Sequence, residues 1–196
     1  MIDNGYLIAG KTLLRREMMA LHKKNRILEF FQEGDRAIFK KCYKESGRVE
    51  SHKEYPYKFV DTTKKKDNRL GIFTDDLDAY NYFDIDSDKS PWELFFNIIV
   101  RLEGSGRKTF VLTDATYHKG RFRMASTLQK ACLNIPKRMK IPDLHKHQEF
   151  FWGRLFHKVE AMTGYKVTKI RGFFPQGSIK CLGFEMEKLK NDKIKE

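Results

Sequence analysis

The sequence predicts an α/β domain with a mostly parallel, seven-stranded sheet that a C-terminal antiparallel hairpin closes. Short apolar and β-branched runs alternate with segments whose apolar residues recur at helical spacing, which is the pattern of helices that cross between parallel strands. Near the C-terminus, two strand-like segments at 165–173 and 178–186 follow each other across a short Pro- and Gly-containing turn, as a hairpin requires.

The N-terminal part of the chain predicts two helices and three strands. Residues 11–24 have apolar side chains near helical spacing among basic ones, which indicates an amphipathic helix. Residues 26–31 form an apolar run that predicts the first strand, and residues 37–43 return to helical spacing. We expect a brief second strand at 48–51 and a third at 57–61.

The middle of the chain has the clearest local signals. Residues 80–86 are strand-like and end in acidic side chains. Ser90 then predicts an N-cap, Pro91 fits the first helical position, and Glu93 completes a capping box. We expect this helix to run to about Glu103.

The remaining segments complete the predicted domain. Residues 108–113 are apolar and β-branched, which is typical of a strand buried on both faces. Residues 118–146 are irregular and basic and predict an insert, and residues 150–162 predict the last helix. Residues 1–187 therefore read as one domain, followed by a charged tail at 188–196.

The charge of the chain points to a polyanionic partner. Among 196 residues, 39 Lys and Arg face 26 Asp and Glu, which gives a net charge of +13 and an isoelectric point near 9.6. Nucleic acid, either RNA or DNA, is the expected partner because neutralised phosphates supply affinity for any sequence. The side chains expected to hold phosphates lie in the basic insert: Lys119, Arg121, Arg123, Lys137, Arg138 and Lys140.

Other partners and compartments are not indicated by the sequence. The most apolar stretch, 94–102, is too short to span a bilayer, and the first residues lack the features of a secretory signal, so we expect a cytoplasmic protein without membrane contact. Cys42, Cys132 and Cys181 are far apart and odd in number, which predicts reduced thiols. No metal site is predicted, because no His or Cys set has fixed ligand spacing.

Residues 5–12 match the phosphate-loop pattern G-x-x-x-x-G-K-[ST]. That motif needs a buried strand before its first glycine, so that backbone amides and a helix N-terminus point at phosphates. Only four residues precede Gly5. We therefore interpret the match as chance.

Asp84 and Asp86 form the most informative constellation. They lie at the end of a predicted strand and share one of its faces, because side chains alternate along a strand. A carboxylate at this place can accept a hydrogen bond from an exocyclic amine and take up its proton. The alternative is structural: either acid caps the following helix or pairs with one of the many basic side chains.

The segment Asp84-Ile85-Asp86-x-x-x-Ser90-Pro91 resembles the D-x-D-P-F/Y-G-S-P motif of tRNA guanine-N2 dimethyltransferases and related small methyltransferases that use S-adenosylmethionine. Residues 110–116 are similar to the strand that follows this motif, and residues 27–35 are similar to the cofactor-binding pattern V-L-D-x-F-x-G-x-G. The resemblance implies a Rossmann-like methyltransferase sheet. It also implies methyl transfer from S-adenosylmethionine to a nucleic acid, at an exocyclic amine.

The resemblance assigns roles to named residues. Asp86 would orient and deprotonate the target nitrogen, with Asp84, Ser90 and Pro91 completing the catalytic motif. Trp92, directly after it, would touch a base, and packing of the helix onto the sheet is the alternative role.

Glu29 and Gly34 would lie by the cofactor, and Glu54 would be the acid that follows the second strand. The motif also departs from the family: Glu33 and Asp35 stand at the two glycine positions of G-x-G. A nucleic-acid-binding module that keeps the fold without catalysis is therefore the alternative function.

Overall fold

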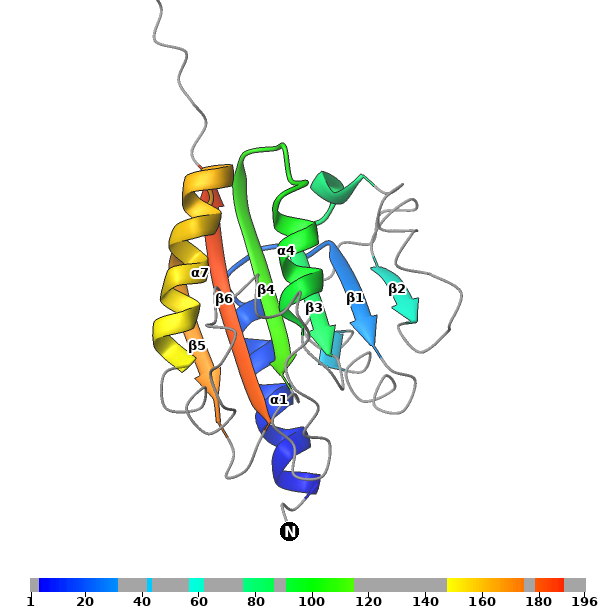
Figure 1. Ribbon diagram of the computed structural model, residues 1–196. Coiled ribbons are helices and arrows are strands. Elements are labelled where there is room, and N and C mark those ends of the chain that lie inside the picture. Colours follow the sequence, from blue (N-terminus) through cyan, green and yellow to red (C-terminus); the bar gives the residue numbers. More distant parts are fainter. Residues whose placement is uncertain are drawn as a thin grey trace, which may run out of the picture.

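A computed structural model gives the fold of the chain. It describes residues 4–31, 42–43, 57–61, 76–86, 91–114, 148–174 and 179–188. In these ranges the chain forms three layers, with a six-stranded mixed sheet between one helix on its rear face and two helices on its front face (Figure 1). This division places different chemistry on the two faces.

The described elements are as follows. The strands are β1 (Ile27–Phe31), β2 (Tyr57–Asp61), β3 (Tyr82–Asp86), β4 (Gly106–Asp114), β5 (Lys166–Phe173) and β6 (Lys180–Lys188). The helices are α1 (Asn4–Met19), α4 (Trp92–Ile99) and α7 (Gln148–Thr163), and a short 3-10 turn, η1, spans Leu77–Ala79.

The strand order is β2-β1-β3-β4-β6-β5. The strands β2, β1, β3 and β4 are parallel, whereas β6 is antiparallel to both β4 and β5. The prediction of a seven-stranded, mostly parallel Rossmann-like methyltransferase sheet is therefore wrong, because the described sheet has six strands and is mixed. The physical reason lies in the second strand: residues 57–61, expected third, pair directly with β1, and residues 48–51 lie outside the described residues.

The C-terminal hairpin is confirmed. Strands β5 and β6 pair antiparallel from Phe173 opposite Cys181 to Lys166 opposite Glu187. The preceding helix α7 ends at Thr163, and Gly164 follows with φ of 75°. A glycine adopts this left-handed conformation without the steric cost that a side chain would add, which explains the sharp turn from α7 into β5.

Two helices differ in extent from the prediction. Helix α1 begins at Asn4, so the phosphate-loop match at 5–12 lies wholly within a helix and not in a loop. Helix α4 has Pro91 at its N-cap without a side-chain cap hydrogen bond, and Ser90 lies outside the described residues. It ends at Ile99, earlier than expected. The chain after it is held by Asp78 Oδ2, which accepts hydrogen bonds from the backbone N–H groups of Glu103 and Gly104, at 3.0 and 2.8 Å.

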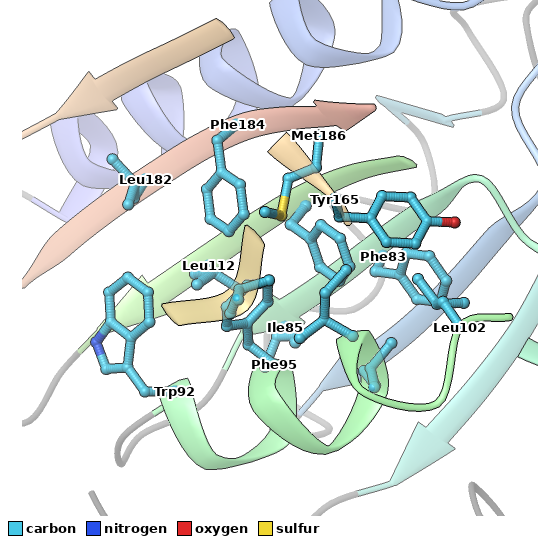
Figure 2. Close-up of a cluster of buried hydrophobic side chains, with 14 of the residues drawn as sticks. Phe83, Ile85, Trp92, Phe95, Leu102, Leu112, Tyr165, Leu182, Phe184 and Met186 are labelled. Carbon is cyan, nitrogen blue, oxygen red and sulfur yellow. The ribbon is translucent and has the colours of Figure 1, made fainter. Parts of the chain in front are cut away.

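The larger core lies between the sheet and helices α4 and α7 (Figure 2). The rings of Phe83 and Phe110 stack with centroids 4.8 Å apart, and those of Phe110 and Phe184 stack at 5.5 Å. Phe95 of α4 meets Phe110 edge-on at 4.9 Å. These rings come from β3, β4, β6 and α4, so their burial joins the centre of the sheet to its covering helix.

The opposite face, under α1, has a smaller core that also holds charge. Its buried apolar residues are Leu14, Met18, Met19, Ile27, Tyr43, Tyr82, Val111 and Cys181. Gly183 of β6 lies where α1 approaches closely: a Cβ added there would be 2.6 Å from Met18 Cγ and 3.1 Å from Leu14 Cδ1. The absence of a side chain at Gly183 thus lets α1 pack onto the antiparallel part of the sheet.

The basic insert at 118–146 lies outside the described residues, as does the tail after Lys188. The single-domain organisation of residues 1–187 stays a prediction.

Two glycine substitutions test this packing. Gly183→Ala should lower the free energy of unfolding by about 1–3 kcal/mol, since the new methyl group overpacks the contact with Met18. Gly153→Ala is the matched control: it lies inside α7 with nothing within 4 Å of an added Cβ, and should raise stability by about 0.5–1 kcal/mol. Urea unfolding of both variants measures the difference. A Gly183→Ala protein as stable as wild type would contradict the close packing of α1 against β6.

Candidate functional site

The sheet has a reversal of strand order at β1. The chain passes from β1 to β2 on one side and later to β3 on the other, so the carboxyl ends of β1 and β3 flank the reversal. Open α/β sheets bind ligands outside the carboxyl ends of their strands at such a point. In the strand register, Phe31 at the end of β1 lies beside both Asp61 of β2 and Asp86 of β3. Two acidic residues therefore end the strands on either side of β1.

Asp84 and Asp86 lie on the face of β3 that α1 covers, as their spacing predicted. Arg15 holds Asp84 with two hydrogen bonds, Nε to Oδ2 at 2.6 Å and Nη2 to Oδ1 at 2.9 Å. Lys11 Nζ donates to both carboxylate oxygens of Asp86, at 3.1 and 2.9 Å. Arg15 Nη2 also reaches Asp86 Oδ2 at 3.4 Å. The four charged side chains form one network between the helix and the sheet.

Helix and strand geometry explain why these pairs match. Lys11 and Arg15 are four residues apart, so they lie on one face of α1 about 6 Å apart along its axis. Asp84 and Asp86 are two residues apart, which spans about 6.6 Å along a strand. Because α1 runs antiparallel to β3, the first cation meets the second acid and both pairs form together.

The inner pair is completely buried. Neither Arg15 nor Asp84 has exposed side-chain surface, and the hydroxyl of Tyr43 also donates to Asp84. Burial raises the pKa of Asp84, and the charge and hydrogen bonds of Arg15 oppose that rise. Burial alone would lower the pKa of Arg15, but Asp84, Tyr43 and Asp86 raise it well above its ordinary value. Burial likewise raises the pKa of Tyr43, so its hydroxyl keeps the proton that it donates.

The outer pair lies nearer the edge. The side chains of Lys11 and Asp86 keep 7% and 10% of their surface exposed. Glu29 of β1, by contrast, is completely buried and stands opposite Asp84 in the register, two residues before the end of its strand. Glu29 therefore lies within β1 and not at its end, which is Phe31. Its role beside a cofactor stays a prediction.

Asp114, which ends β4, makes its hydrogen bond to a residue on the other face of the sheet. The indole N–H of Trp92, at the start of α4, donates to Asp114 Oδ2 at 2.9 Å. Trp92 is 1% exposed and packs against Trp152 of α7 with ring centroids 5.9 Å apart. This arrangement fixes the N-terminus of α4 on the sheet. Trp92 thus has the packing role that the sequence analysis gave as the alternative to contact with a base.

The structure brings together some of the residues expected at the site and leaves others apart. Asp84 and Asp86 lie side by side on one face, whereas Trp92 and Pro91 begin a helix on the other face. The expected residues outside the described ranges are Gly34, Glu54, Ser90, Lys119, Arg121, Arg123, Lys137, Arg138 and Lys140.

Sequence reasoning did not find Lys11, Arg15 or Tyr43. The signal for the two cations was their four-residue spacing on the side of α1 that also carries Leu14 and Met18. Asp61 was also missed as the acid that ends the strand beside β1, because the second strand was expected earlier in the chain and Glu54 was assigned instead.

No protein-family model matches the chain, and no curated protein sequence matches it. Within the described ranges, no helix is long and apolar enough to cross a membrane. In those same ranges, no three His, Cys, Asp or Glu side chains are grouped as ligands for a metal ion.

Substitutions in the inner pair test its structural role. Arg15→Met and Asp84→Asn should each lower the free energy of unfolding by about 3–5 kcal/mol, because each removes the partner of a buried charged group. The combination Arg15→Met with Asp84→Asn should cost less than the sum of the two single changes.

The control is the exposed pair of Lys166 and Glu160, whose side chains are 71% and 40% exposed. Lys166→Met should change stability by no more than about 0.5 kcal/mol. Urea unfolding compares all the variants. Equal effects for the buried and the exposed pair would contradict the described network.

Proposed function

We propose that this chain transfers a methyl group from S-adenosylmethionine to a nucleic acid, at an exocyclic amine. The observation that supports the proposal is the place of Asp86: it ends β3, beside the reversal of strand order, at the rim of a buried charge network. The motif around Asp86 resembles that of nucleic-acid methyltransferases, and the net charge of +13 favours a phosphate-rich substrate.

The acids at this edge of the sheet fit the chemistry of S-adenosylmethionine. Its ribose hydroxyls and its ammonium group are hydrogen-bond donors, and carboxylates accept such bonds. Asp86 ends a strand beside β1, and Glu54 stays the proposed acid near the ribose. Gly34, in the segment after β1, stays the proposed glycine of the cofactor turn. When bound, this cofactor supplies an electrophilic methyl group.

Asp86 would act on the target amine. Its two oxygens accept three hydrogen bonds from Lys11 and Arg15, and a carboxylate offers about four lone-pair positions, so one further bond from an amine can form. That bond would orient the nitrogen lone pair. As the nitrogen gains the methyl group it loses a proton, which Asp86 would accept.

We also propose that the basic side chains of residues 118–146 hold the phosphates of the substrate, and that the chain acts in the cytoplasm. The second proposal is supported by the odd number and wide spacing of the cysteines, which do not indicate a disulfide framework.

A second function, nucleic-acid binding without methyl transfer, is favoured by one specific observation. Asp86 is only 8% exposed, and both of its oxygens are engaged by cations of α1. A carboxylate used in this way stabilises the fold whether or not an amine reaches it. Methyl transfer requires the ion pair of Lys11 and Asp86 to open so that a substrate amine can reach Asp86, whereas binding alone does not.

Methyl incorporation from labelled cofactor into RNA and DNA panels separates the two functions. Asp86→Asn should lower methyl incorporation by about 100-fold or more while the affinities for cofactor and nucleic acid change little, because the carboxylate acts mainly in the transition state. Asp84→Asn should instead lower stability, since Asp84 is fully buried. Wild-type protein that binds nucleic acid but methylates none of the panel would establish the second function.

A further inference from the structure

Three exposed aromatic rings lie at one end of the molecule. Tyr6, Phe150 and Phe174 are 58%, 60% and 47% exposed. Tyr6 lies in the first turn of α1, Phe150 in the first turn of α7, and Phe174 directly after β5. All three elements reach the end of the sheet at which β1, β3 and β4 terminate, the lower end in Figure 1. We call these three rings the aromatic edge.

Basic side chains accompany two of the rings. The ammonium group of Lys180 lies 5.3 Å from the centroid of Phe174, and the guanidinium group of Arg154 lies 5.5 Å from that of Phe150. Both distances are within the range of cation–π contacts. Phe150 and Phe174 are thus each paired with a positive charge.

The rings are held in place by neighbouring aromatic side chains. Tyr6 lies 5.5 Å from Phe173, centroid to centroid, and Phe174 lies 5.9 Å from Trp152. Phe174 also folds over Gly172, where any side chain would collide with its ring. Exposed rings that the fold holds in fixed positions lose little conformational freedom on binding a ligand.

We propose that the aromatic edge binds single-stranded nucleic acid, with bases stacked on Phe150, Phe174 and Tyr6, and phosphates bound by Lys180 and Arg154. Aromatic rings beside cations are the combination that binds single strands, because every unpaired base offers a flat face and every linkage a negative charge. In a duplex these faces are stacked on one another, so the rings have nothing to stack on. The inference rests on the proposed function in taking nucleic acid as the ligand.

The aromatic edge lies at the same end of the sheet as the proposed catalytic residue. Asp86 ends β3 at this same end of the sheet, and Lys180, which begins β6, stands opposite Asp114 in the register of β4. A strand bound at the aromatic edge therefore lies at the same end of the sheet as Asp86. Unpaired bases held there are presented with their exocyclic amines accessible.

Matched pairs of alanine variants test the aromatic edge. Phe150→Ala is compared with Met162→Ala, since both side chains lie on α7 and are 60% and 57% exposed, but at opposite ends of the helix. Phe174→Ala is compared with Ile170→Ala, at 47% and 46%. The probes are fluorescein-labelled single-stranded RNA, single-stranded DNA and the corresponding duplexes, titrated by fluorescence anisotropy beside a melting curve for each variant.

Each phenylalanine variant should weaken single-strand binding by about fivefold or more, the loss expected for one base–aromatic stack. The Met162 and Ile170 variants should stay within about twofold of wild type, and duplex binding should change equally little. Glu149→Gln, which removes the acid next to Phe150, should strengthen binding, a result that damage to the fold cannot produce. Comparison of the RNA and DNA arms identifies which strand is preferred.

Three outcomes would overturn the inference: no binding of single strands by wild type, equal losses in the phenylalanine variants and their controls, or equal losses for duplex and single strand. Loss of binding at the aromatic edge in a protein that methylates nothing would support the inference and reject the methyl transfer. Unchanged binding in variants of an active methyltransferase would reject only the inference.

Discussion

The buried ion pair of Arg15 and Asp84 fixes the position of α1 on the sheet. Both side chains lack exposed surface, and removing two ions from water carries a large desolvation cost that only close, multiple hydrogen bonds can offset. Those bonds form in one geometry, with two guanidinium nitrogens and the Tyr43 hydroxyl directed at one carboxylate. A slide of α1 by one turn would separate the charges inside the core. The pair therefore sets the helix register even where apolar contacts would allow several.

The two faces of the sheet bury different kinds of side chain. The face under α4 and α7 buries stacked rings such as Phe83, Phe110 and Phe184 (Figure 2). These rings stabilise the fold by burying apolar surface, and they do not hold charged side chains in position. The face under α1 buries acids on adjacent strands and must compensate them with cations. Because α1 runs antiparallel to β3, its N-terminal residues reach the carboxyl ends of the strands. The network is thus tied to the same end of the sheet as the aromatic edge.

Local signals predicted the elements well, whereas long-range partners were not visible in the sequence. Strand β4 and the closing hairpin follow from β-branched runs and a turn, and the shared face of Asp84 and Asp86 follows from strand alternation. The partner Lys11 is 75 positions away from Asp86, and no local pattern connects them. The place of residues 57–61 in the sheet was wrong, because propensity does not show which segment pairs with β1. Strand order and pairing depend on tertiary contacts that a single sequence does not display.

The two ion pairs differ in burial, and this difference would let one acid stabilise the fold while the other serves the proposed catalysis. Breaking the inner pair would leave charge in a fully enclosed space, so Asp84 has no freedom to serve a substrate. The outer pair lies at the rim, where Lys11 ends in a flexible four-carbon chain and water can replace either partner. On the proposed function, Lys11 would move from Asp86 to a phosphate while Arg15 keeps α1 in register. Asp84 would then stabilise the fold, and Asp86, two positions further along the same strand, would meet the substrate.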